Sequence, residues 1–532
     1  MDYTYRYPSQ RAPVFARNAV ATSHPLAAQA GLDMLGRGGN AVDAAVATAM
    51  ALTVLEPTSN GIGADNFALV WIGGGLHGLN ASGRAPRGLK RLRYEGMSAI
   101  PYYGWDGVTT PGAVSGWVAL ARAFGTLPMT TLAEPAIRYA RQGAVLPPEI
   151  GYYWSRAAGI YKRDQQAHWF ETFTSNARAP RVGELFRLPH HADTLQAIAE
   201  SEGRAFYLGD LARKIEQASI AGGGDLRADD LASHTPDWVR PISLDYHGWR
   251  LHEIPPNGQG LVALIALGIL RRFDMKSLDP DSAESLHLSI EAMKLAFADG
   301  HEHIADPDAM RVTVDALLDE DYLASRARLI DRVRAQDFGH GQPKQGGTVL
   351  LCAADAEGTM VSMIQSNYSG FGSGVVVPGT GISLQNRGCC FSLEPGHVNE
   401  VAPGKRPYHT IIPGFVTRDE GDVEKPVMAF GVMGGFMQPQ GHAQVLMRMA
   451  DHDMNPQSAL DAPRWQVTAG LKVSIEPGFD DAVYERLRAL GHDLTVHEKR
   501  NAAFGRGQVI YRLPDGYCAG SDLRSDGQAV GF

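Results

Sequence analysis

Hydrophobic residues along this chain recur with two different periods, and the change falls near residue 347. Up to about residue 300, most apolar runs have the three- to four-residue spacing of amphipathic helices. Gly38-Gly39 ends one such run, and Asn40 is a suitable N-cap for the next, which stops before Pro57. The spacing predicts helices over residues 25–37, 40–55, 116–124, 132–142, 194–201, 261–273 and 282–299.

Short strand-like runs make up the rest of the pattern. Residues 67–72 and 76–80 flank Gly73-Gly74-Gly75, which predicts a hairpin at about 67–80. These glycines lack the Gly-x-Gly-x-x-Gly spacing and open no helix, so nucleotide binding is not favoured. Further strands are predicted over 349–354, 360–365, 411–417, 427–432, 471–475 and 509–513. This order favours an α+β fold in which stacked antiparallel sheets are flanked by helices.

Length and charge narrow the class of protein. A chain of 532 residues needs several packed units or one large layered domain. The net charge of -9 argues against a nucleic-acid partner, and the basic residues between 84 and 93 are interpreted as a solvated face, or as a face with one member in an anion pocket. The N-terminus shows no secretory signal, and the apolar stretch 41–55 is too short to cross a bilayer. We therefore predict a cytoplasmic protein with no membrane partner.

The cysteines do not indicate a metal centre. Cys352, Cys389, Cys390 and Cys518 lack zinc-ligand spacing, and we interpret them as small buried hydrophobic residues; a cysteine nucleophile is the alternative. No cluster of His, Asp or Glu has ligand spacing either. The sequence predicts neither a metal nor a cofactor.

The junction of Gly347 and Thr348 is the candidate for chemistry. A polar, glycine-rich stretch over 334–347 leads into the strand that Thr348 opens. In a self-cleaving N-terminal-nucleophile enzyme, such a hydroxyl attacks the preceding carbonyl, and an N-to-O acyl shift followed by hydrolysis frees its α-amino group. That amine titrates at about 7.7 to 8.0 in model peptides, so it can act as the base for its own hydroxyl. Taken alone, the pattern also fits an ordinary loop entering a sheet.

Segments spread over almost the whole chain resemble the γ-glutamyltransferase family of N-terminal-nucleophile hydrolases. They match in order and at the family's spacing, at residues 37–45 (Arg-Gly-Gly-Asn-Ala-Val-Asp-Ala-Ala), 61–63, 110–112, 139–143, 255–256, 296–299, 306–307, 371–374, 405–407, 434–435 and 521–527 (Ser-Asp-Leu-Arg-Ser-Asp-Gly). The resemblance implies an αββα sandwich cut between Gly347 and Thr348. Residues 1–347 would form a mostly helical α chain and 348–532 a strand-rich β chain, the two remaining one intertwined unit.

The resemblance also assigns catalytic roles by position. The family's nucleophilic threonine falls on Thr348, and the hydroxyl residue that steadies it falls on Ser366. The glycines whose N–H groups line the oxyanion hole fall on Gly434 and Gly435. Donors of this type are typically worth about 2.7 to 4 kcal/mol each in acyl transfer.

Departures from the family pattern bear on the substrate. The arginine that holds the substrate α-carboxylate in γ-glutamyl transferases is replaced by Ser82, and the aspartate that pairs with the α-amino group is replaced by Cys390. A γ-glutamyl head group is therefore predicted to bind poorly. The planar guanidinium of Arg387, with that of Arg84, is suited to bidentate hydrogen bonding of a carboxylate that has no neighbouring amine. The alternative for Arg387 is a structural salt bridge.

Three further positions complete the predicted substrate site. The substrate-facing serines of the transferases fall on His409 and Thr410, and Tyr368 lies in a run that resembles a cytoplasmic branch of the family. That branch includes oxamate amidohydrolases of purine breakdown and glutaryl-type acylases. His409 can contact a substrate carboxylate or protonate a leaving amine; alternatively, backbone partners hold it in place.

The leading hypothesis is a self-cleaving amidohydrolase for a small carboxylate-bearing amide, with oxamate converted to oxalate and ammonia. A glutathione hydrolase or γ-glutamyl transferase is the first alternative, and a glutaryl-type acylase the second. An uncleaved protein that only binds a carboxylate is a further alternative. The expected partners are the substrate and the two chains of one precursor.

Overall fold

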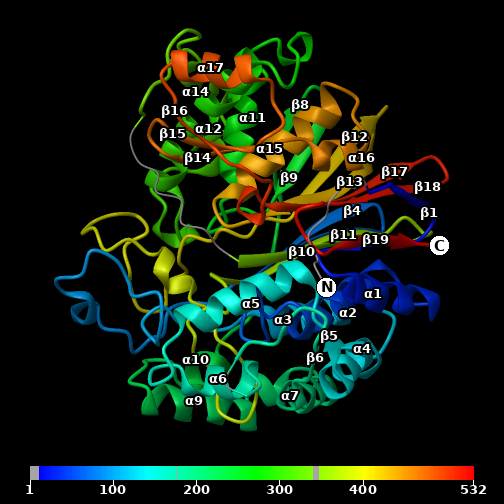
Figure 1. Ribbon diagram of the computed structural model, residues 1–532, viewed down its shortest axis with the longest axis vertical. Coiled ribbons are helices and arrows are strands. Elements are labelled where there is room, and N and C mark those ends of the chain that lie inside the picture. The colour runs from blue at the N-terminus through cyan, green and yellow to red at the C-terminus, as the bar shows by residue number, and fades with distance from the viewer. Residues whose placement is uncertain (1–10, 177, 339–346) are drawn as a thin grey trace.

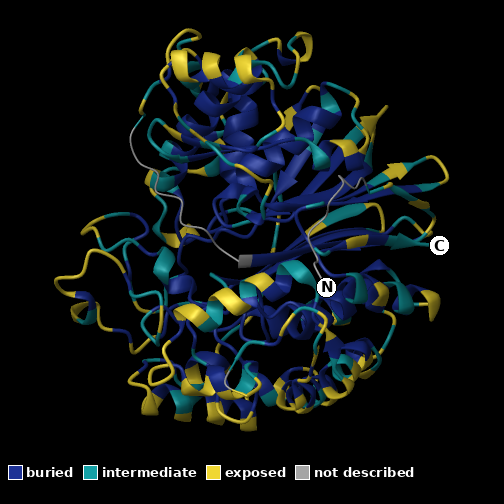
Figure 2. Cartoon of the chain, in the orientation of Figure 1, coloured by how far each residue is buried: buried dark blue, intermediate teal, exposed yellow. Residues whose placement is uncertain are grey.

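Two large antiparallel sheets packed face to face form the centre of the protein, and helices cover both outer faces (Figure 1). The computed structural model describes residues 11–176, 178–338 and 347–532. Buried residues concentrate in the two sheets and in the helix faces turned toward them (Figure 2). This arrangement confirms the predicted αββα sandwich.

The first sheet, named here the β10 sheet, carries Thr348. Every pairing within it is antiparallel. Its strands in spatial order are β19 (Gln528–Gly531), β2 (Ala19–Thr22), β10 (Gly347–Ala354), β11 (Met360–Tyr368), β3 (Asp65–Ile72), β4 (Gly75–Ala81) and β7 (Asp237–Val239).

The second sheet, named here the β13 sheet, is also antiparallel throughout. Its order is β1 (Val14–Ala16), β18 (Gly516–Ser521), β17 (Arg506–Leu513), β13 (Val423–Met433), β12 (Gly414–Glu420), β9 (Trp249–Glu253) and β8 (Ile242–Tyr246). Two small sheets lie outside this pair and consist of β14 (Trp465–Ala469), β15 (Lys472–Ile475) and β16 (Asp493–Val496), and of β5 (Ala144–Val145) and β6 (Leu185–Phe186).

Helices form a layer on each side of the sandwich. The longer ones on the β10 side are α1 (Pro25–Gly36), α2 (Ala41–Leu55), α3 (Ala113–Phe124), α4 (Met129–Gln142), α5 (Pro148–Ile160), α7 (Pro189–Glu200) and α9 (Asp210–Ala221). The longer ones on the β13 side are α11 (Gly260–Leu270), α12 (Ala283–His303), α14 (Glu320–Ala327), α15 (Met437–Ala450) and α17 (Asp481–Ala489). The shorter helices are α6 (Ala167–Phe173), α8 (Arg204–Tyr207), α10 (Ala228–Ala232), α13 (Val314–Leu317) and α16 (Pro456–Asp461).

Three apolar cores hold these layers together. Side chains such as Phe67, Leu350 and Phe415 fill the space between the two sheets. A second core lies between the β10 sheet and helices α1 to α4, and a third lies between the β13 sheet and helices α11, α12 and α15. Each sheet is therefore buried on both faces, which explains why its strands are apolar without strict alternation.

Local signals account for the elements that were predicted well. The Asn40 side chain accepts hydrogen bonds from the N–H groups of Val42 and Asp43, and the Asp43 side chain accepts one from the Asn40 N–H, so α2 begins with a capping box. Gly73 and Gly74, with φ of 61° and 82°, make the turn of the predicted hairpin.

Other predictions were less accurate. Strand β12 begins at Gly414 rather than at residue 411, because the preceding segment bonds to other parts of the chain: the His409 N–H donates to the Asn257 carbonyl, and Gln259 Nε2 donates to the Thr410 carbonyl. Strands β8 and β9 and helices α5, α9, α15 and α17 were not predicted. Part of the predicted loop, residues 339–346, lies outside the described residues.

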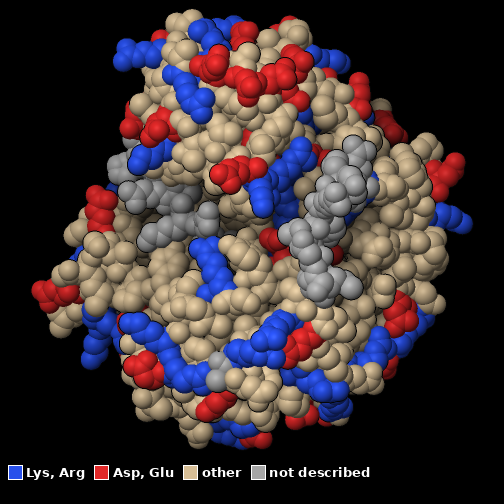
Figure 3. Space-filling model, in the orientation of Figure 1, with Lys and Arg blue, Asp and Glu red and all other residues tan. Residues whose placement is uncertain are grey.

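The surface carries charged side chains of both signs. Basic and acidic residues are interspersed over the face seen in Figure 3. Among the described residues, no helix is both long enough and apolar enough to cross a membrane.

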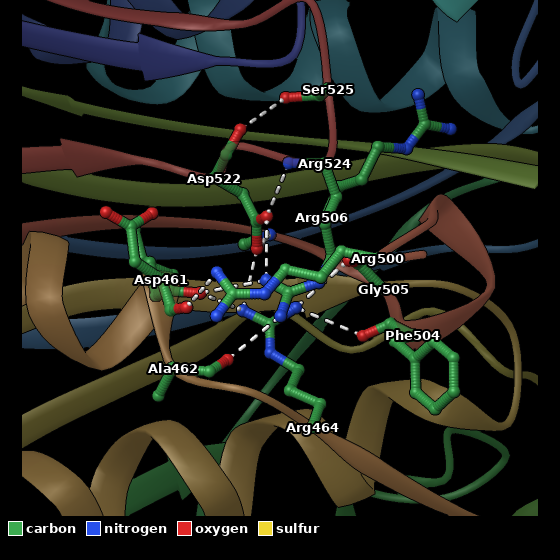
Figure 4. A network of polar contacts seen from close by, with 12 residues as sticks. Asp461, Ala462, Arg464, Arg500, Phe504, Gly505, Arg506, Asp522, Arg524 and Ser525 are labelled. Carbon is green, nitrogen blue, oxygen red and sulfur yellow. Dashed lines mark hydrogen bonds and ion pairs between the residues drawn. The ribbon is translucent and has the colours of Figure 1, made fainter. Parts of the chain in front are cut away.

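A buried network of charges supports the C-terminal end of the chain (Figure 4). Arg464 Nη2 lies 2.6 Å from Asp522 Oδ2, and Arg524 Nη1 lies 3.1 Å from Asp522 Oδ1. Arg524 also pairs with the buried carboxylate of Glu476. Burial by itself raises the pKa of Asp522, but the two arginines reverse the effect and lower it to about 2.

A further buried ion pair joins the N-terminal and C-terminal parts of the chain. Arg506 Nη1 lies 2.8 Å from Glu56 Oε1, and Arg506 Nη2 donates to Ser59 Oγ. Both large sheets likewise contain strands from before and after residue 347. The segments on either side of the predicted cut therefore form one body.

Candidate active site

Thr348 lies at an irregular position at the start of a central strand. Strand β10 pairs with β2 on one side and β11 on the other, but its register with β11 shifts between Gly347 and Val349. Gly347 pairs with Tyr368 and Val349 with Gln365, so Thr348 lies in a local β-bulge. Bulges frequently redirect a side chain next to an active site.

The Thr348 hydroxyl contacts the hydroxyl predicted to steady it. Thr348 Oγ1 and Ser366 Oγ are 3.0 Å apart, and both side chains are fully buried. The Tyr368 N–H donates to Ser366 Oγ over 2.8 Å. Ser366 Oγ therefore contacts both the Thr348 hydroxyl and a backbone N–H. The structure thus brings together the two residues that the sequence paired.

The glycine pair predicted to form the oxyanion hole follows β13 directly. Gly434 and Gly435 have φ of 141° and 62°, a backbone conformation that other residues rarely adopt. Gln259 Nε2 donates to the Gly435 carbonyl, which holds the turn from one side. Helix α15 begins two residues later, at Met437. The N–H groups of the glycines are not bonded to any backbone carbonyl of the described residues.

Arg387 is a buried cation without a carboxylate partner among the described residues. It lies in a short 3₁₀ turn, Arg387–Cys390, and its side chain has no exposed surface. Nη1 donates to Thr410 Oγ1 over 2.7 Å, and the guanidinium carbon lies 4.7 Å from the centre of the Tyr368 ring. Nε and Nη2 have no hydrogen-bond partner among the described residues. The structure therefore brings Arg387, Thr410 and Tyr368 together.

His409 is held by other parts of the protein. Its Nε2 lies 3.0 Å from Asp65 Oδ2, and its Nδ1 accepts a bond from the Ile411 N–H. Burial lowers the pKa of His409 well below its ordinary value, and Arg387 and Arg406 lower it further. Because both ring nitrogens are bonded, His409 fits the alternative in which protein partners hold it in place better than it fits a substrate contact.

Asp65 is the important residue that the sequence reasoning missed. It pairs directly with Ser366 across strands β3 and β11, so the two side chains are on the same face of the sheet. Its Oδ1 accepts from the N–H groups of Gly83 and Gly112. Burial raises the pKa of Asp65 to about 7, while Arg387 and these N–H groups act against the rise. An acidic residue close before the apolar run 67–72 was the available signal.

The second predicted arginine is already engaged. Arg84 Nη1 lies 2.8 Å from Asp306 Oδ2 and also donates to the Gly404 carbonyl. It borders a cavity of about 200 Å³ with Arg87 and Arg406, each of which pairs with an aspartate of its own. The structure gives no contact between Arg84 and Arg387.

Ser82 and Cys390, which depart from the transferase pattern, each contact a polar side chain. Ser82 is buried, and its hydroxyl donates to Asn80 Oδ1 over 2.7 Å. The sulfur of Cys390 lies 3.9 Å from Arg387 Nη1. Cys352 and Cys518 are buried as predicted, and Cys389 and Cys390 are partly buried.

One group of potential metal ligands was not predicted. His287, Glu291 and His492 each offer a ligand atom within 4.8 Å of the others, which makes them the one such group among the described residues. The group has internal partners: His287 Nδ1 lies 2.8 Å from His492 Nε2, and Lys294 pairs with Glu291. A lysine ammonium against the carboxylate opposes a bound cation, so these residues fit a metal poorly.

The fold and the paired hydroxyls define an N-terminal-nucleophile hydrolase, and comparison with known proteins gives the family. The model of the Gamma-glutamyltranspeptidase family matches residues 27–532, and the chain belongs to this family. Its members related to this chain are self-processing proenzymes that act on amide bonds, and so is this protein.

Three relatives show how the similarity is distributed. The chain is 37% identical to the oxamate amidohydrolase proenzyme of Klebsiella pneumoniae over 97% of this chain and 98% of that protein. It is 35% identical to the glutathione hydrolase-like YwrD proenzyme of Bacillus subtilis, with the same coverage. The crystal structure of a cephalosporin acylase from Bacillus halodurans superposes with a TM-score of 0.95 at 51% identity, covering 100% of this chain and 99% of that one.

Proposed function

We propose that the protein hydrolyses the amide of a small carboxylate-bearing substrate, with oxamate converted to oxalate and ammonia as the leading reaction. The observation that carries this proposal is Arg387. A fully buried guanidinium is costly unless an anion binds it, and Nε and Nη2 of Arg387 have no partner among the described residues. Its fork suits a carboxylate.

The position of Arg387 also relates it to the proposed cleavage junction. Its guanidinium stacks on Tyr368, and Tyr368 pairs with Gly347, the residue before the proposed nucleophile. Directly paired residues in an antiparallel sheet lie about 5 Å apart. Tyr368 therefore links the Arg387 guanidinium to the cleavage junction, which supports placing the substrate carboxylate at Arg387.

The proposed mechanism uses residues of this chain alone. After cleavage between Gly347 and Thr348, the Thr348 amine takes the proton of its own hydroxyl, and Oγ1 attacks the amide carbon. Ser366 orients that oxygen, and the N–H groups of Gly434 and Gly435 stabilise the oxyanion. The protonated amine then gives its proton to the amide nitrogen, which leaves as ammonia, and the freed amine takes a proton from the water that hydrolyses the ester on Thr348.

Arg387 contributes by binding rather than by proton transfer. It neutralises the substrate carboxylate, and a cation at this position disfavours a substrate ammonium. Similarity to the oxamate amidohydrolase of Klebsiella pneumoniae supports the same substrate class. A cytoplasmic location and a place in purine breakdown belong to this proposal and rest on the resemblance.

A second candidate is an acylase for glutaryl-type side chains. The cephalosporin acylase of Bacillus halodurans, at 51% identity, favours it. A glutathione hydrolase or γ-glutamyl transferase is less favoured, because Ser82 and Cys390 replace the groups that hold the amino acid end of a γ-glutamyl substrate.

A substrate panel on the purified, self-cleaved protein tests the proposal. We expect ammonia release from oxamate to exceed turnover of glutaryl and γ-glutamyl anilides, with Thr348→Ala inactive and uncleaved on a denaturing gel. Rapid γ-glutamyl-anilide hydrolysis with no ammonia from oxamate would overturn it. Preference for the glutaryl amide would select the second candidate.

A further inference from the structure

Tyr368 has a backbone conformation unlike that of any other buried non-glycine residue in the described chain. Its φ is 75°, and only 2% of the residue is exposed. The other described non-glycine residues with positive φ are all exposed: Asn176, Glu202, His247 and Asp453. Left-handed backbone is unfavourable for a bulky side chain, and such strain tends to occur at functional sites.

The Tyr368 N–H lies against the proposed catalytic pair. That N–H donates to Ser366 Oγ over 2.8 Å, and Ser366 Oγ lies 3.0 Å from Thr348 Oγ1. The φ of Tyr368 sets how its side chain and the following chain are rotated about the N–Cα bond relative to this N–H. The left-handed value therefore determines where the Tyr368 ring lies while its N–H stays bonded to the serine that contacts the nucleophile.

The same residue supports the cation at the proposed anion site. The Tyr368 ring lies beneath the Arg387 guanidinium, with 4.7 Å between the guanidinium carbon and the ring centre. The phenol oxygen contacts the Tyr102 hydroxyl at 3.3 Å, which holds the ring from its far end. Stacking on a ring restricts the guanidinium to one plane while leaving its edge open to a carboxylate.

We propose that Tyr368 is a positioning residue that aligns two parts of the site at once: its N–H aligns Ser366 and hence Thr348, and its ring aligns Arg387. This inference deepens the proposed function and rests on it for the role of Arg387. The alignment of Ser366 by the Tyr368 N–H is the backbone half of the proposal, and the alignment of Arg387 by the ring is the ring half. The backbone half does not depend on the substrate, because Thr348 and Ser366 also act in self-cleavage. The two halves predict different kinetic effects.

The backbone half is tested by two variants that both lack the ring. Glycine adopts φ near 75° without steric cost, whereas a β-branched valine strongly disfavours it. We expect Tyr368→Gly to self-cleave within about threefold of the wild-type rate, and Tyr368→Val to be at least about tenfold slower in self-cleavage and in kcat. Equal rates for the two variants would overturn this half.

The ring half is tested by Tyr368→Gly and Tyr368→Phe with oxamate as substrate. The phenylalanine variant keeps the stacking and loses the contacts of the phenol with Tyr102 and Cys390, so its KM should stay within about threefold. The glycine variant should raise KM at least about tenfold with kcat little changed. An unchanged KM in Tyr368→Gly would overturn this half.

The design separates failure of this inference from failure of the proposed function. If the wild-type protein releases no ammonia from oxamate, the proposed function fails, and the dissociation constant of oxalate measured by calorimetry replaces KM. Self-cleavage on a denaturing gel is unaffected by that result. Circular dichroism and urea midpoints confirm that each variant is folded.

Discussion

Arg387 and Arg524 are both fully buried, yet their surroundings differ completely. Arg524 pairs with Asp522 and Glu476 and donates to the carbonyls of Leu460 and Ala462 (Figure 4). Arg387 has a threonine hydroxyl, a cysteine sulfur and an aromatic ring, and two of its nitrogens have no described partner. Burial alone therefore does not separate the two arginines; the number of acceptors around each guanidinium distinguishes Arg524 from Arg387, for which we propose a role in binding.

The largest expected effect concerns the structural arginine. Arg524→Met leaves the buried carboxylates of Asp522 and Glu476 without this partner, which typically costs about 3 to 5 kcal/mol. Urea unfolding of the uncleaved Thr348→Ala protein, with and without the substitution, measures the difference. A loss below about 1 kcal/mol would mean that the network in Figure 4 does not stabilise the fold as inferred.

The matched substitution at the other arginine should affect activity instead of stability. Arg387→Met removes a buried cation that has no ion-pair partner, so the free energy of unfolding should stay within about 1 kcal/mol or rise. We expect kcat/KM for oxamate to fall about 100-fold, which is about 2.7 kcal/mol, with self-cleavage unchanged. Full activity in Arg387→Met would remove the basis of the anion site.

A smaller, pH-dependent effect is expected at Asp65, which faces Arg387 without forming an ion pair. Burial raises its pKa from 3.8 to about 7, so the folded protein binds this proton more tightly than the unfolded chain. The resulting stabilisation is present below about pH 4 and is lost as pH rises through about 7.

The Asp65→Asn variant provides the reference for this measurement. Wild-type stability should decline relative to the variant between about pH 4 and 7, and the difference should then stay constant. Urea midpoints across this range give the curve. A difference independent of pH would show that the Asp65 carboxylate is already ionised in the folded protein at low pH. The N–H groups of Gly83, Gly112 and His409 and the Arg387 guanidinium favour that ionised form.

The smallest effect is expected at Arg84, the second arginine predicted to bind substrate. Its side chain is 43% exposed and already paired with Asp306. Arg84→Met should change stability by less than about 1 kcal/mol and kcat/KM for oxamate by less than about threefold. A loss comparable to that of Arg387→Met would restore Arg84 to the substrate site.

Sequence reasoning succeeded where the signal was local or carried by the family resemblance. The Asn40 capping box, the Gly73-Gly74 turn and the Thr348–Ser366 spacing of eighteen residues were all readable in the chain. The layered fold followed from the resemblance and from the order of helices and strands.

Features that depend on distant contacts were not predictable in this way. The bulge at Thr348 arises from the register between β10 and β11, and the role of Asp65 arises from three segments that meet only in the fold. His409 was left with two interpretations because its partners, Asp65 and the Ile411 N–H, are fixed by the tertiary structure.

The distribution of strands across residue 347 has a consequence for how the protein can be studied. Each large sheet combines strands from both sides of the proposed cut, and the buried Arg506–Glu56 pair also crosses it. Once cut, the protein unfolds into two molecules, so its midpoint of denaturation should rise with protein concentration. Refolding then becomes a second-order reaction between two polypeptides, and the single-chain precursor is the form in which the sandwich can assemble at high dilution.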